Sequence, residues 1–312
     1  MSKDFLVAGC TGLVGSALMD HFKSSEISAM GLSTKDVDFR NFDATLELFE
    51  KIKPKVVIDA AARVGGIKHN QSFPVEFLLD NLRIQNNLME VSHKIGVEKF
   101  IFLGSSCIYP RLARQPIKEE YLMSGELEKT NSAYAVAKIA GIELVKSYRK
   151  EYGHNWISLM PTNIYGPRDN FDPERAHVIP ALIRRFIAAV QEGSEFVEVW
   201  GTGTPRREFL FARDLADAIV FCSNNYDSEI HLNVGTGHDI SIRELAELIG
   251  EIVDFRGDIR FNHQFPDGTP QKLLDVSKLS ELGWRAKTSL KEGLCKTVDW
   301  YINNQGGNFA NG

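Results

Sequence analysis

The chain has 312 residues, of which 43% are hydrophobic and 25% are charged, a balance typical of globular enzymes. Its net charge of −5 argues against a broad nucleic-acid-binding surface. The four cysteines are too scattered for a disulfide framework, and none has the spacing of a metal site. The first residues contain no apolar run long enough for a signal peptide or a membrane span, so we expect a cytoplasmic protein that binds neither membrane nor nucleic acid.

Short apolar runs alternate with longer helical patterns in the first half. The expected strands are residues 5–8, 27–31, 56–59, 100–104 and 156–160. The expected helices are residues 13–23, 44–53, 75–95 and 134–151. Runs such as 55–59 are apolar without alternation, as in strands covered on both faces. Alternating βα units imply right-handed crossovers and a parallel sheet. The pattern therefore predicts an α/β fold with a Rossmann-type doubly wound parallel sheet.

The regular alternation of strands and helices ends after Pro161, where turn-rich segments separate further helices. We expect these helices at residues 178–191, 212–223, 241–253 and 290–303, the third opened by a capping box of Ser241 and Glu244. The tail from 303 to 312 is expected to fray. Residues 1–165 form the expected dinucleotide-binding domain, which also receives part of 209–235. Residues 166–312 form a smaller α/β substrate-binding region.

A GxxGxxG turn directly follows the first strand and opens a helix. Glycines let the backbone approach a pyrophosphate, and the helix N-terminus offers free N–H groups. The residues expected to bind the cofactor here are Gly9, Cys10, Thr11, Gly12, Leu13, Val14 and Gly15. A tight turn without ligand is the alternative, but the place of the turn at the start of a βαβ unit favours dinucleotide binding.

The end of the second strand bears on the choice between NAD and NADP. An NAD site usually has a carboxylate there to hold the ribose 2′-hydroxyl. Here Ser33, Thr34 and Lys35 follow the strand, and the first acid is Asp36. A carboxylate would repel a 2′-phosphate and these three residues would not, which favours NADP. No arginine is placed to clamp the phosphate, so we expect a loose preference.

Besides the glycine turn, a second group of candidate residues consists of Ser105, Tyr134 and Lys138. Tyr134 and Lys138 form a YxxxK pair, which lies on one face of a helix, and Ser105 ends the fourth strand. Reduction of a ketone leaves an alkoxide that needs a proton, which Tyr134 can supply. An ammonium about 4 Å away would lower the pKa of the phenol by roughly 3 units. Ser105 would hydrogen-bond the carbonyl oxygen. An incidental Tyr and Lys on a surface helix is the alternative.

These motifs together resemble the extended short-chain dehydrogenase/reductase family, which contains nucleotide-sugar epimerases, dehydratases and reductases. Further stretches narrow the resemblance: GSSCIYP at 104–110, PTNIYGP at 161–167 and HVIPAL at 177–182. With them, the chain resembles the GDP-L-fucose synthase family from the glycine turn to Trp284. Members epimerise C3 and C5 of GDP-4-keto-6-deoxy-D-mannose and reduce C4 with NADPH, which gives GDP-L-fucose.

The resemblance assigns roles that single residues do not reveal. It implies that Cys107 is the base and His177 the acid of epimerisation, because each carbon loses a proton on one face and gains one on the other. It implies that the GDP group is held by Arg185, Trp200, Arg207 and Asp267. It adds Lys138, Pro161, Asn163, Ile164 and His177 to the cofactor-binding residues. Thr11 is a departure, since close relatives often carry arginine there, a residue that would touch the 2′-phosphate.

Two alternatives stay open beside this interpretation. One keeps the enzyme but changes its sugar, for example to a GDP-4-keto-heptose, or omits the epimerisation. The other is a cofactor-binding regulatory protein without turnover, against which the intact Ser105, Tyr134 and Lys138 argue. Relatives pair through two long helices, here 75–95 and 133–151, which carry apolar residues on more than one face. We therefore expect a homodimer.

Overall fold

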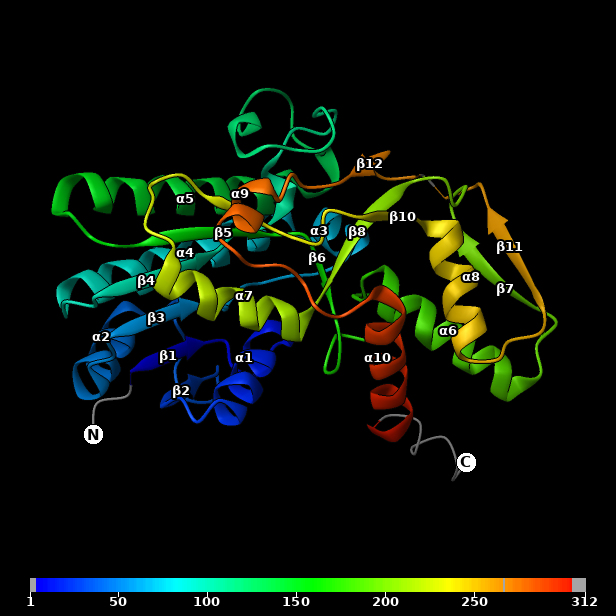
Figure 1. Ribbon diagram of the computed structural model, residues 1–312, viewed down its shortest axis with the longest axis horizontal. Helices are drawn as coiled ribbons and strands as arrows, with labels where there is room; N and C mark the ends of the chain where they lie inside the picture. The colour runs from blue at the N-terminus through cyan, green and yellow to red at the C-terminus, as the bar shows by residue number, and fades with distance from the viewer. Residues whose placement is uncertain (1–3, 266, 305–312) are drawn as a thin grey trace.

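A six-stranded parallel sheet is the centre of the larger lobe in the computed structural model, which describes residues 4–265 and 267–304 (Figure 1). The strand order is β2-β1-β3-β4-β5-β9. The strand bounds are β1 Phe5–Ala8, β2 Ala29–Leu32, β3 Val56–Asp59, β4 Lys99–Leu103, β5 Ile157–Pro161 and β9 Leu232–Val234. The order changes direction at β1, so a crevice for ligands opens between β1 and β3. The predicted Rossmann-type doubly wound parallel sheet is confirmed.

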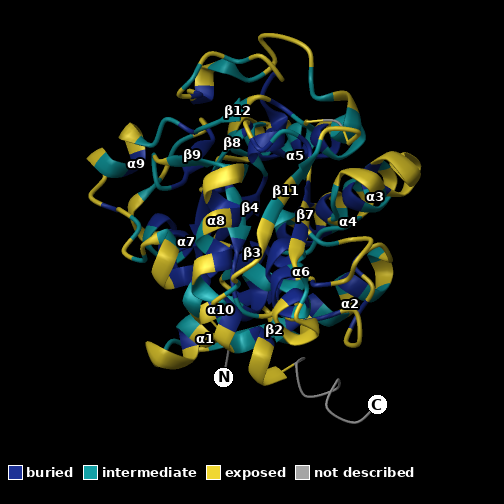
Figure 2. Ribbon diagram, turned by 90° about the vertical axis from the view of Figure 1, so that its right-hand side faces the viewer, coloured by how far each residue is buried: buried dark blue, intermediate teal, exposed yellow. Residues whose placement is uncertain are grey.

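Helices cover both faces of this sheet. One face carries α1 Leu13–Ser24 and α7 Ala212–Asn225, and the other carries α2 Phe42–Ile52, α4 Pro74–Lys94 and α5 Ser132–Tyr152. Successive residues of a strand point to opposite faces. In β4, for example, Phe100 and Phe102 pack toward α4 and α5, whereas Ile101 packs toward α1 and α7. Both faces of each inner strand are thus buried (Figure 2).

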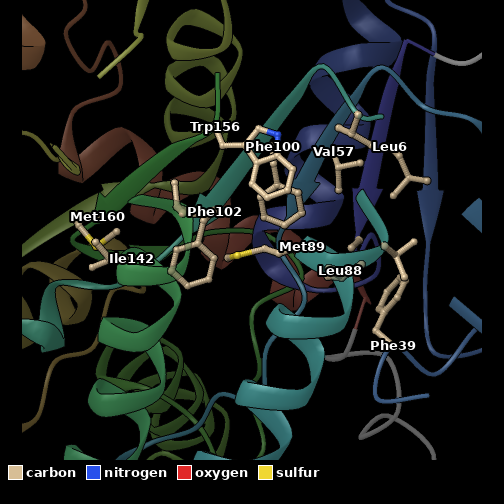
Figure 3. Packing of buried hydrophobic residues seen from close by; sticks show 14 of the residues in the cluster. Leu6, Phe39, Val57, Leu88, Met89, Phe100, Phe102, Ile142, Trp156 and Met160 are labelled. Atoms are coloured by element: carbon tan, nitrogen blue, oxygen red, sulfur yellow. The ribbon is translucent and has the colours of Figure 1, made fainter. Parts of the chain in front are cut away.

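The core on the α4/α5 face holds the strand that carries the candidate catalytic serine. In Figure 3, Phe100 and Phe102 lie against Met89 of α4 and Ile142 of α5, with Met160 of β5 beside them. All five side chains are essentially inaccessible to water. Close packing of this kind holds the strand end in one position.

A smaller lobe is built on two further sheets. The strand β7 Phe196–Trp200 pairs with β11 Asp258–Asn262, and β8 Arg206–Phe211 pairs with β6 Asn163–Tyr165, β10 Asp239–Ser241 and β12 Gln271–Lys272. The helices α6 Val178–Glu192, α8 Ile242–Ile252 and α10 Leu290–Asn304 pack against them. No helix among the described residues is both long and apolar enough to cross a membrane.

The bounds of the helices predicted from the sequence agree closely with the observed bounds. The capping box at the start of α8 is confirmed, since Ser241 and Glu244 bond each other's backbone. A strand does return to the main sheet, because β9 pairs with β5. The short elements that were not predicted are β6, β7, β8, β10, β11, β12, α3 Ile67–Ser72 and α9 Ser277–Glu281. The tail expected to fray lies, from residue 305, outside the described residues.

Asp169 is a buried carboxylic acid in the segment between β6 and α6. Its Oδ1 accepts the backbone N–H of Asn170 at 2.7 Å, and its Oδ2 has no partner. Burial raises the pKa of Asp169 to about 7, and the bond from Asn170 only partly opposes this. The native state therefore favours the neutral acid. Its contribution to stability is complete below pH 3.8 and is lost as the pH rises through 7.

Replacement of Asp169 by asparagine is expected to raise the free energy of unfolding more at about pH 8 than at about pH 5, because only the charged acid is penalised. A shift of roughly three pKa units sets an upper limit of about 4 kcal/mol. Denaturant titration at both pH values measures the effect, with the exposed Asp299→Asn as control. Equal gains at the two pH values would contradict this assignment.

Candidate active site

The candidate residues gather where the parallel strands end. The glycine turn follows β1, Ser105 follows β4, and Pro161 is the last residue of β5. Because parallel strands end at the same edge of a sheet, these segments meet beside the crevice at β1 and β3. Tyr134, His177 and Lys272 are crowded by protein and still keep solvent-accessible surface. We define the candidate cleft by these three side chains and the strand ends beside them.

The glycine turn has the geometry of a phosphate cradle. Gly9 has a φ of 84°, in the left-handed region that favours glycine. A Cβ on Gly15 would lie 2.1 Å from the carbonyl oxygen of Gly9, so no side chain fits there. Gly12 begins α1 without a side-chain cap, which leaves the first N–H groups of the helix available to an anion. The turn therefore fits the pyrophosphate of a dinucleotide.

The segment after β2 has few cations available for a 2′-phosphate. Asp36 accepts hydrogen bonds of 2.8 Å from both the backbone N–H and the hydroxyl of Ser33. These two bonds lower the pKa of Asp36, so the carboxylate is charged at neutral pH. Arg40 is already paired with Asp38 and Asp80. Lys35 and Thr11, which are both exposed, remain to meet the ribose.

Ser105, Tyr134 and Lys138 approach each other from β4 and α5. The 3-10 helix η1 Ser106–Ile108, which Ser105 caps, packs against α5. The Tyr134 ring makes an edge contact with Phe77 of α4, with the ring centres 6.4 Å apart. The Lys138 ammonium lies 5.9 Å from the centre of the Tyr134 ring and donates to the carbonyl oxygen of Leu103 at 2.9 Å. The three side chains share one wall of the cleft.

The predicted lowering of the Tyr134 pKa is wrong for this arrangement. Burial raises the pKa of Tyr134, and the neighbouring Cys107 and Asp59 raise it further. Lys138 does not offset this, because its proton is directed to Leu103 and it interacts more closely with Asp59. Burial raises the pKa of Asp59 to about 6. The phenol is thus held protonated, which is the state that a proton donor needs.

Cys107 and His177 come from different lobes and share one charged neighbour, Lys272. Cys107 lies in η1, where its N–H donates to the hydroxyl of Ser105 at 3.4 Å. Burial raises the pKa of the Cys107 thiol, opposed first by Lys272 and then by Ser105 and Lys138. His177 is the N-cap residue of α6. Burial lowers the pKa of His177, and Lys272 lowers it further. Cys107 and His177 are therefore both within electrostatic reach of one lysine.

The loop before α3 helps to place His177. Gly66 donates its N–H to the carbonyl oxygen of Arg175 at 3.1 Å. A Cβ on Gly66 would lie 2.9 Å from the carbonyl oxygen of Ala176, so only glycine allows this approach. Asn70 holds the loop by bonds to the carbonyl oxygens of Gly65 and Gly66. The segment before His177 is thereby fixed against the larger lobe.

An aromatic stack marks the outer part of the site. The Arg185 guanidinium lies 4.5 Å from the centre of the Trp200 ring, and it donates to the carbonyl oxygen of Glu198 at 3.1 Å. Trp200 stacks on Phe265 with the ring centres 4.3 Å apart and an angle of 12° between the planes. Trp200 is still 48% exposed, so part of the ring can contact a ligand beside this stack.

Arg207, which is partly buried, and Asp267, which is exposed, lie in the same lobe. Burial lowers the pKa of Arg207, and the nearby Asp267 and Glu128 oppose this effect. Asp267 accepts hydrogen bonds from the backbone and hydroxyl of Thr202, at 3.0 and 2.7 Å. It thereby ties the segment before β12 to the turn after Trp200. A partly buried arginine with two nearby carboxylates can bind a diphosphate when the ligand enters.

Comparison with known proteins agrees with this geometry. The model of the NAD dependent epimerase/dehydratase family matches residues 5–235. The chain belongs to the NAD-dependent epimerase/dehydratase family. The match runs from the first strand past the return strand β9, so it includes the glycine turn, Ser105, Tyr134 and Lys138.

Within the family, relatives that act on GDP-sugars are similar over the whole chain. The probable GDP-L-fucose synthase 1 of Oryza sativa subsp. japonica is 50% identical over 300 residues, which cover 96% of this chain and 92% of the relative. A GDP-L-fucose synthetase of Naegleria fowleri bound to NADP has a TM-score of 0.90 and 32% identity, and covers 97% of this chain and 96% of its own. A GDP-6-OMe-4-keto-L-xylo-heptose reductase of Campylobacter jejuni has a TM-score of 0.92 and 34% identity, and covers 97% and 98%.

Several residues of the cleft were not singled out from the sequence. Asp59 ends β3 and has an unpartnered Oδ2 close to Lys138. Phe265 completes the stack on Trp200. Glu208 of β8 accepts backbone N–H groups of Thr236, Gly237 and Leu274, and so joins β8, the turn after β9 and the segment after β12. Lys272 of β12 is the fourth residue that was not singled out from the sequence. The only sequence signal for Asp59 was an acid at the end of a predicted strand, and the only signal for Glu208 was an acid just before an apolar run.

Proposed function

We propose that this enzyme epimerises C3 and C5 of GDP-4-keto-6-deoxy-D-mannose and reduces C4 with NADPH, which gives GDP-L-fucose. The proposal is supported by Cys107, which lies next to Ser105 and in electrostatic reach of Tyr134 and Lys138, and by His177, which shares the neighbour Lys272 with Cys107. Reduction alone does not use a second acid–base pair. The names of the relatives support the GDP-sugar and NADP.

Residues 1–165 together with β9 are proposed to bind the cofactor, and residues 166–312 the sugar nucleotide. The turn from Gly9 to Gly15 would hold the pyrophosphate on the N-terminus of α1. Lys138, Pro161, Asn163, Ile164 and His177 would line the nicotinamide half. Bound NADPH supplies a hydride to C4. Ser33 and Lys35 suit a 2′-phosphate better than Asp36 does, so NADPH is preferred only loosely over NADH.

Epimerisation uses two groups on opposite sides of the sugar ring. The 4-keto group acidifies the protons at C3 and C5. The Cys107 thiolate removes such a proton, and the resulting enolate carries the charge on the C4 oxygen. His177 returns a proton to the other face of the carbon. The lowered pKa of His177 makes its imidazolium a stronger acid. Both groups must then exchange protons with solvent before they can act again.

Reduction uses the wall formed by β4 and α5. The Ser105 hydroxyl donates a hydrogen bond to the C4 oxygen and fixes its position. Tyr134, which is protonated, gives its proton to the same oxygen as the alcohol forms. Lys138 then stands beside a phenolate, where its positive charge stabilises the product side of the transfer. Burial lowers the pKa of Lys138, and Asp59 opposes this effect and so helps it remain an ammonium.

The GDP group is proposed to extend into the smaller lobe. The exposed part of Trp200, in a stack with Arg185 and Phe265, would contact the guanine. Arg207 would clamp the diphosphate. Asp267 would complete the site near the turn that follows Trp200. A second candidate, reduction of a GDP-4-keto-heptose, is favoured by the likeness to the heptose reductase of C. jejuni.

Direct turnover distinguishes these functions. The protein is incubated with enzymatically prepared GDP-4-keto-6-deoxy-D-mannose and either NADPH or NADH, and the product is identified by NMR. GDP-L-fucose is the expected product, and it should form with NADPH at least as fast as with NADH. Formation of the C4-reduced but unepimerised sugar would support a pure reductase. Cofactor binding without turnover of this sugar or of a GDP-4-keto-heptose would support a regulatory protein.

We propose further that the enzyme is a homodimer paired through α4 and α5, which pack side by side. Their outer surface carries the exposed apolar side chains Val75, Leu79 and Val136. Burial of this surface in a second copy would remove it from water. Light scattering at micromolar concentration is expected to give twice the mass of 35.0 kDa, and Leu79→Asp should shift it toward the monomer. A mass of about 35.0 kDa for the wild-type protein, that of a monomer, would contradict this proposal.

A further inference from the structure

The turn after β7 is built around one carboxylate from a distant segment. The strands β7 and β11 run parallel and end together at Trp200 and Asn262 (Figure 1). The next residue, Gly201, donates its N–H to the carbonyl oxygen of Asn262 at 2.9 Å. Beyond β11, Asp267 accepts the N–H of Thr202 at 3.0 Å and the Thr202 hydroxyl at 2.7 Å. The two segments that leave these strands are therefore tied to each other again beyond the strand ends.

The backbone of the turn is shaped to receive this carboxylate. Gly201 has a φ of 83°, in the left-handed region that favours glycine. A Cβ on Gly201 would overlap Oδ1 of Asp267. The Thr202 hydroxyl, which donates to Asp267, also accepts the N–H of Thr204 at 3.2 Å and lies 2.7 Å from the Thr204 hydroxyl. Only glycine at position 201 allows the carboxylate to approach the turn so closely.

Each side of this connection carries a residue that is proposed to hold the GDP group. Trp200 directly precedes the turn, and its ring stacks on Phe265 at 4.3 Å between centres. Gly268 directly follows Asp267, and a Cβ there would lie 3.1 Å from Nη2 of Arg207. The other terminal nitrogen of Arg207 donates to a backbone carbonyl oxygen at 2.8 Å. The segment that contains Asp267 thus lies against both Trp200 and Arg207.

The separation of these two residues matters to a ligand that uses both. A GDP group presents its base and its diphosphate at a separation limited by the ribose between them. A site that holds the groups for both ends in advance loses less conformational entropy on binding. Surface turns are otherwise mobile, but hydrogen bonds to a carboxylate are stronger than bonds between neutral groups. The bonds from Thr202 to Asp267 therefore limit how far Trp200 can move relative to Arg207.

We propose that Thr202 and Asp267 form a latch of positioning residues, which sets the separation between Trp200 and Arg207 and so fits the site to a nucleoside diphosphate. The proposal rests on the proposed role of Trp200 and Arg207 in holding GDP. Both carboxylate oxygens of Asp267 accept bonds from Thr202. Asp267 therefore acts through the turn, and Thr202 gains a role that no sequence motif assigns to it.

The direct test observes Trp200 before any ligand is added. The full-length protein is labelled with fluorotryptophan, and the fluorine NMR signal of Trp200 is identified as the one that Trp200→Phe lacks. Asp267→Ala is expected to broaden this signal, and Thr202→Val should do so to a smaller extent, because it removes only the hydroxyl bond. Thr202→Ser keeps both donors and should restore the wild-type signal. The signal of Trp156, in the core of the larger lobe, is the internal control.

An unchanged Trp200 signal in Asp267→Ala would overturn the proposal. If Asp267→Ala fails to fold by circular dichroism, Asp267→Asn, which keeps one acceptor, gives the same comparison with a smaller expected effect. The exposed Asp258→Ala removes an acid at the opposite end of β11 and should match wild type.

A second measurement asks whether the latch serves the ligand. Asp267→Ala is expected to weaken the binding of GDP about tenfold in calorimetry, an effect within the range of hydrogen bonds to charged groups. KM for the GDP-sugar should rise by the same factor, with kcat nearly unchanged. Thr202→Val should weaken GDP binding on its own, and it should add little to Asp267→Ala, because the two residues act as one unit.

The pattern of the single and double variants distinguishes the possible outcomes. Thr202→Val without effect on GDP binding, or with its full effect added to that of Asp267→Ala, would overturn the latch and make Asp267 a direct ligand. GDP that binds wild type and Asp267→Ala equally well would also overturn it. Failure of the proposed GDP site itself would show separately, as a wild-type protein that binds no GDP.

Discussion

Replacement of Cys107 by serine is expected to slow the exchange of the C3 and C5 protons by roughly 10²- to 10⁴-fold, the range that a positioned base contributes. A serine hydroxyl fills the same space in η1 but does not ionise near neutral pH. Exchange is followed by NMR with GDP-4-keto-6-deoxy-D-mannose in deuterated solvent and without reduced cofactor. The loss should appear in kcat, because the residues proposed to hold the sugar nucleotide lie in the other lobe.

The control for this experiment is Cys295→Ser, which changes a cysteine on α10 far along the chain from η1. It should leave exchange at the wild-type rate. Cofactor binding should also survive in Cys107→Ser, since the glycine turn is untouched. Exchange in Cys107→Ser within about twofold of wild type would remove Cys107 as the base, because a lost base costs far more.

Replacement of Tyr134 by phenylalanine is expected to lower the rate of NADPH oxidation by roughly 10²- to 10⁴-fold while the exchange at C3 and C5 largely persists. The ring stays in contact with Phe77, so the wall of the cleft keeps its shape. Only the proton for the C4 oxygen is missing. The two activities are measured on the same preparation, one by absorbance and one by NMR.

Tyr148→Phe is a matched control, because Tyr148 lies on the same helix and packs against His93 and Trp156, away from the catalytic wall. It should oxidise NADPH at the wild-type rate. If Tyr134→Phe kept that rate as well, the proton would have to come from another group. If it lost exchange and reduction equally, Tyr134 would belong to the epimerisation step.

The first half of the fold could be predicted because its signals are local. The turn at Gly9, the apolar strands and the YxxxK pair of Tyr134 and Lys138 each lie within one short stretch of chain. Burial on both faces makes the strands read as continuous apolar runs. The observed bounds of β1 and β3 equal the predicted ones, 5–8 and 56–59, and the long helices differ by only a few residues at each end.

The smaller lobe could not be predicted in the same detail. Its strands are short, and they pair across long separations, as when β12 joins β8 and β11 joins β7. No local periodicity records such a pairing, so Lys272 and Phe265 had no signal in the sequence. The Tyr134 pKa was mispredicted for a related reason. The spacing of YxxxK gives the helix face, but the hydrogen bond from Lys138 to Leu103 depends on how α5 packs on β4.

One cleft is proposed to perform both the epimerisation and the reduction of the same sugar. Isotopic labelling tests this proposal most directly. Wild-type enzyme is given GDP-4-keto-6-deoxy-D-mannose and unlabelled NADPH in deuterated water, and the product is analysed by NMR. We expect GDP-L-fucose with deuterium at C3 and C5 and protium at C4. A C4-reduced product with protium at all three carbons would contradict the account, because Cys107 and His177 would then take no part in turnover.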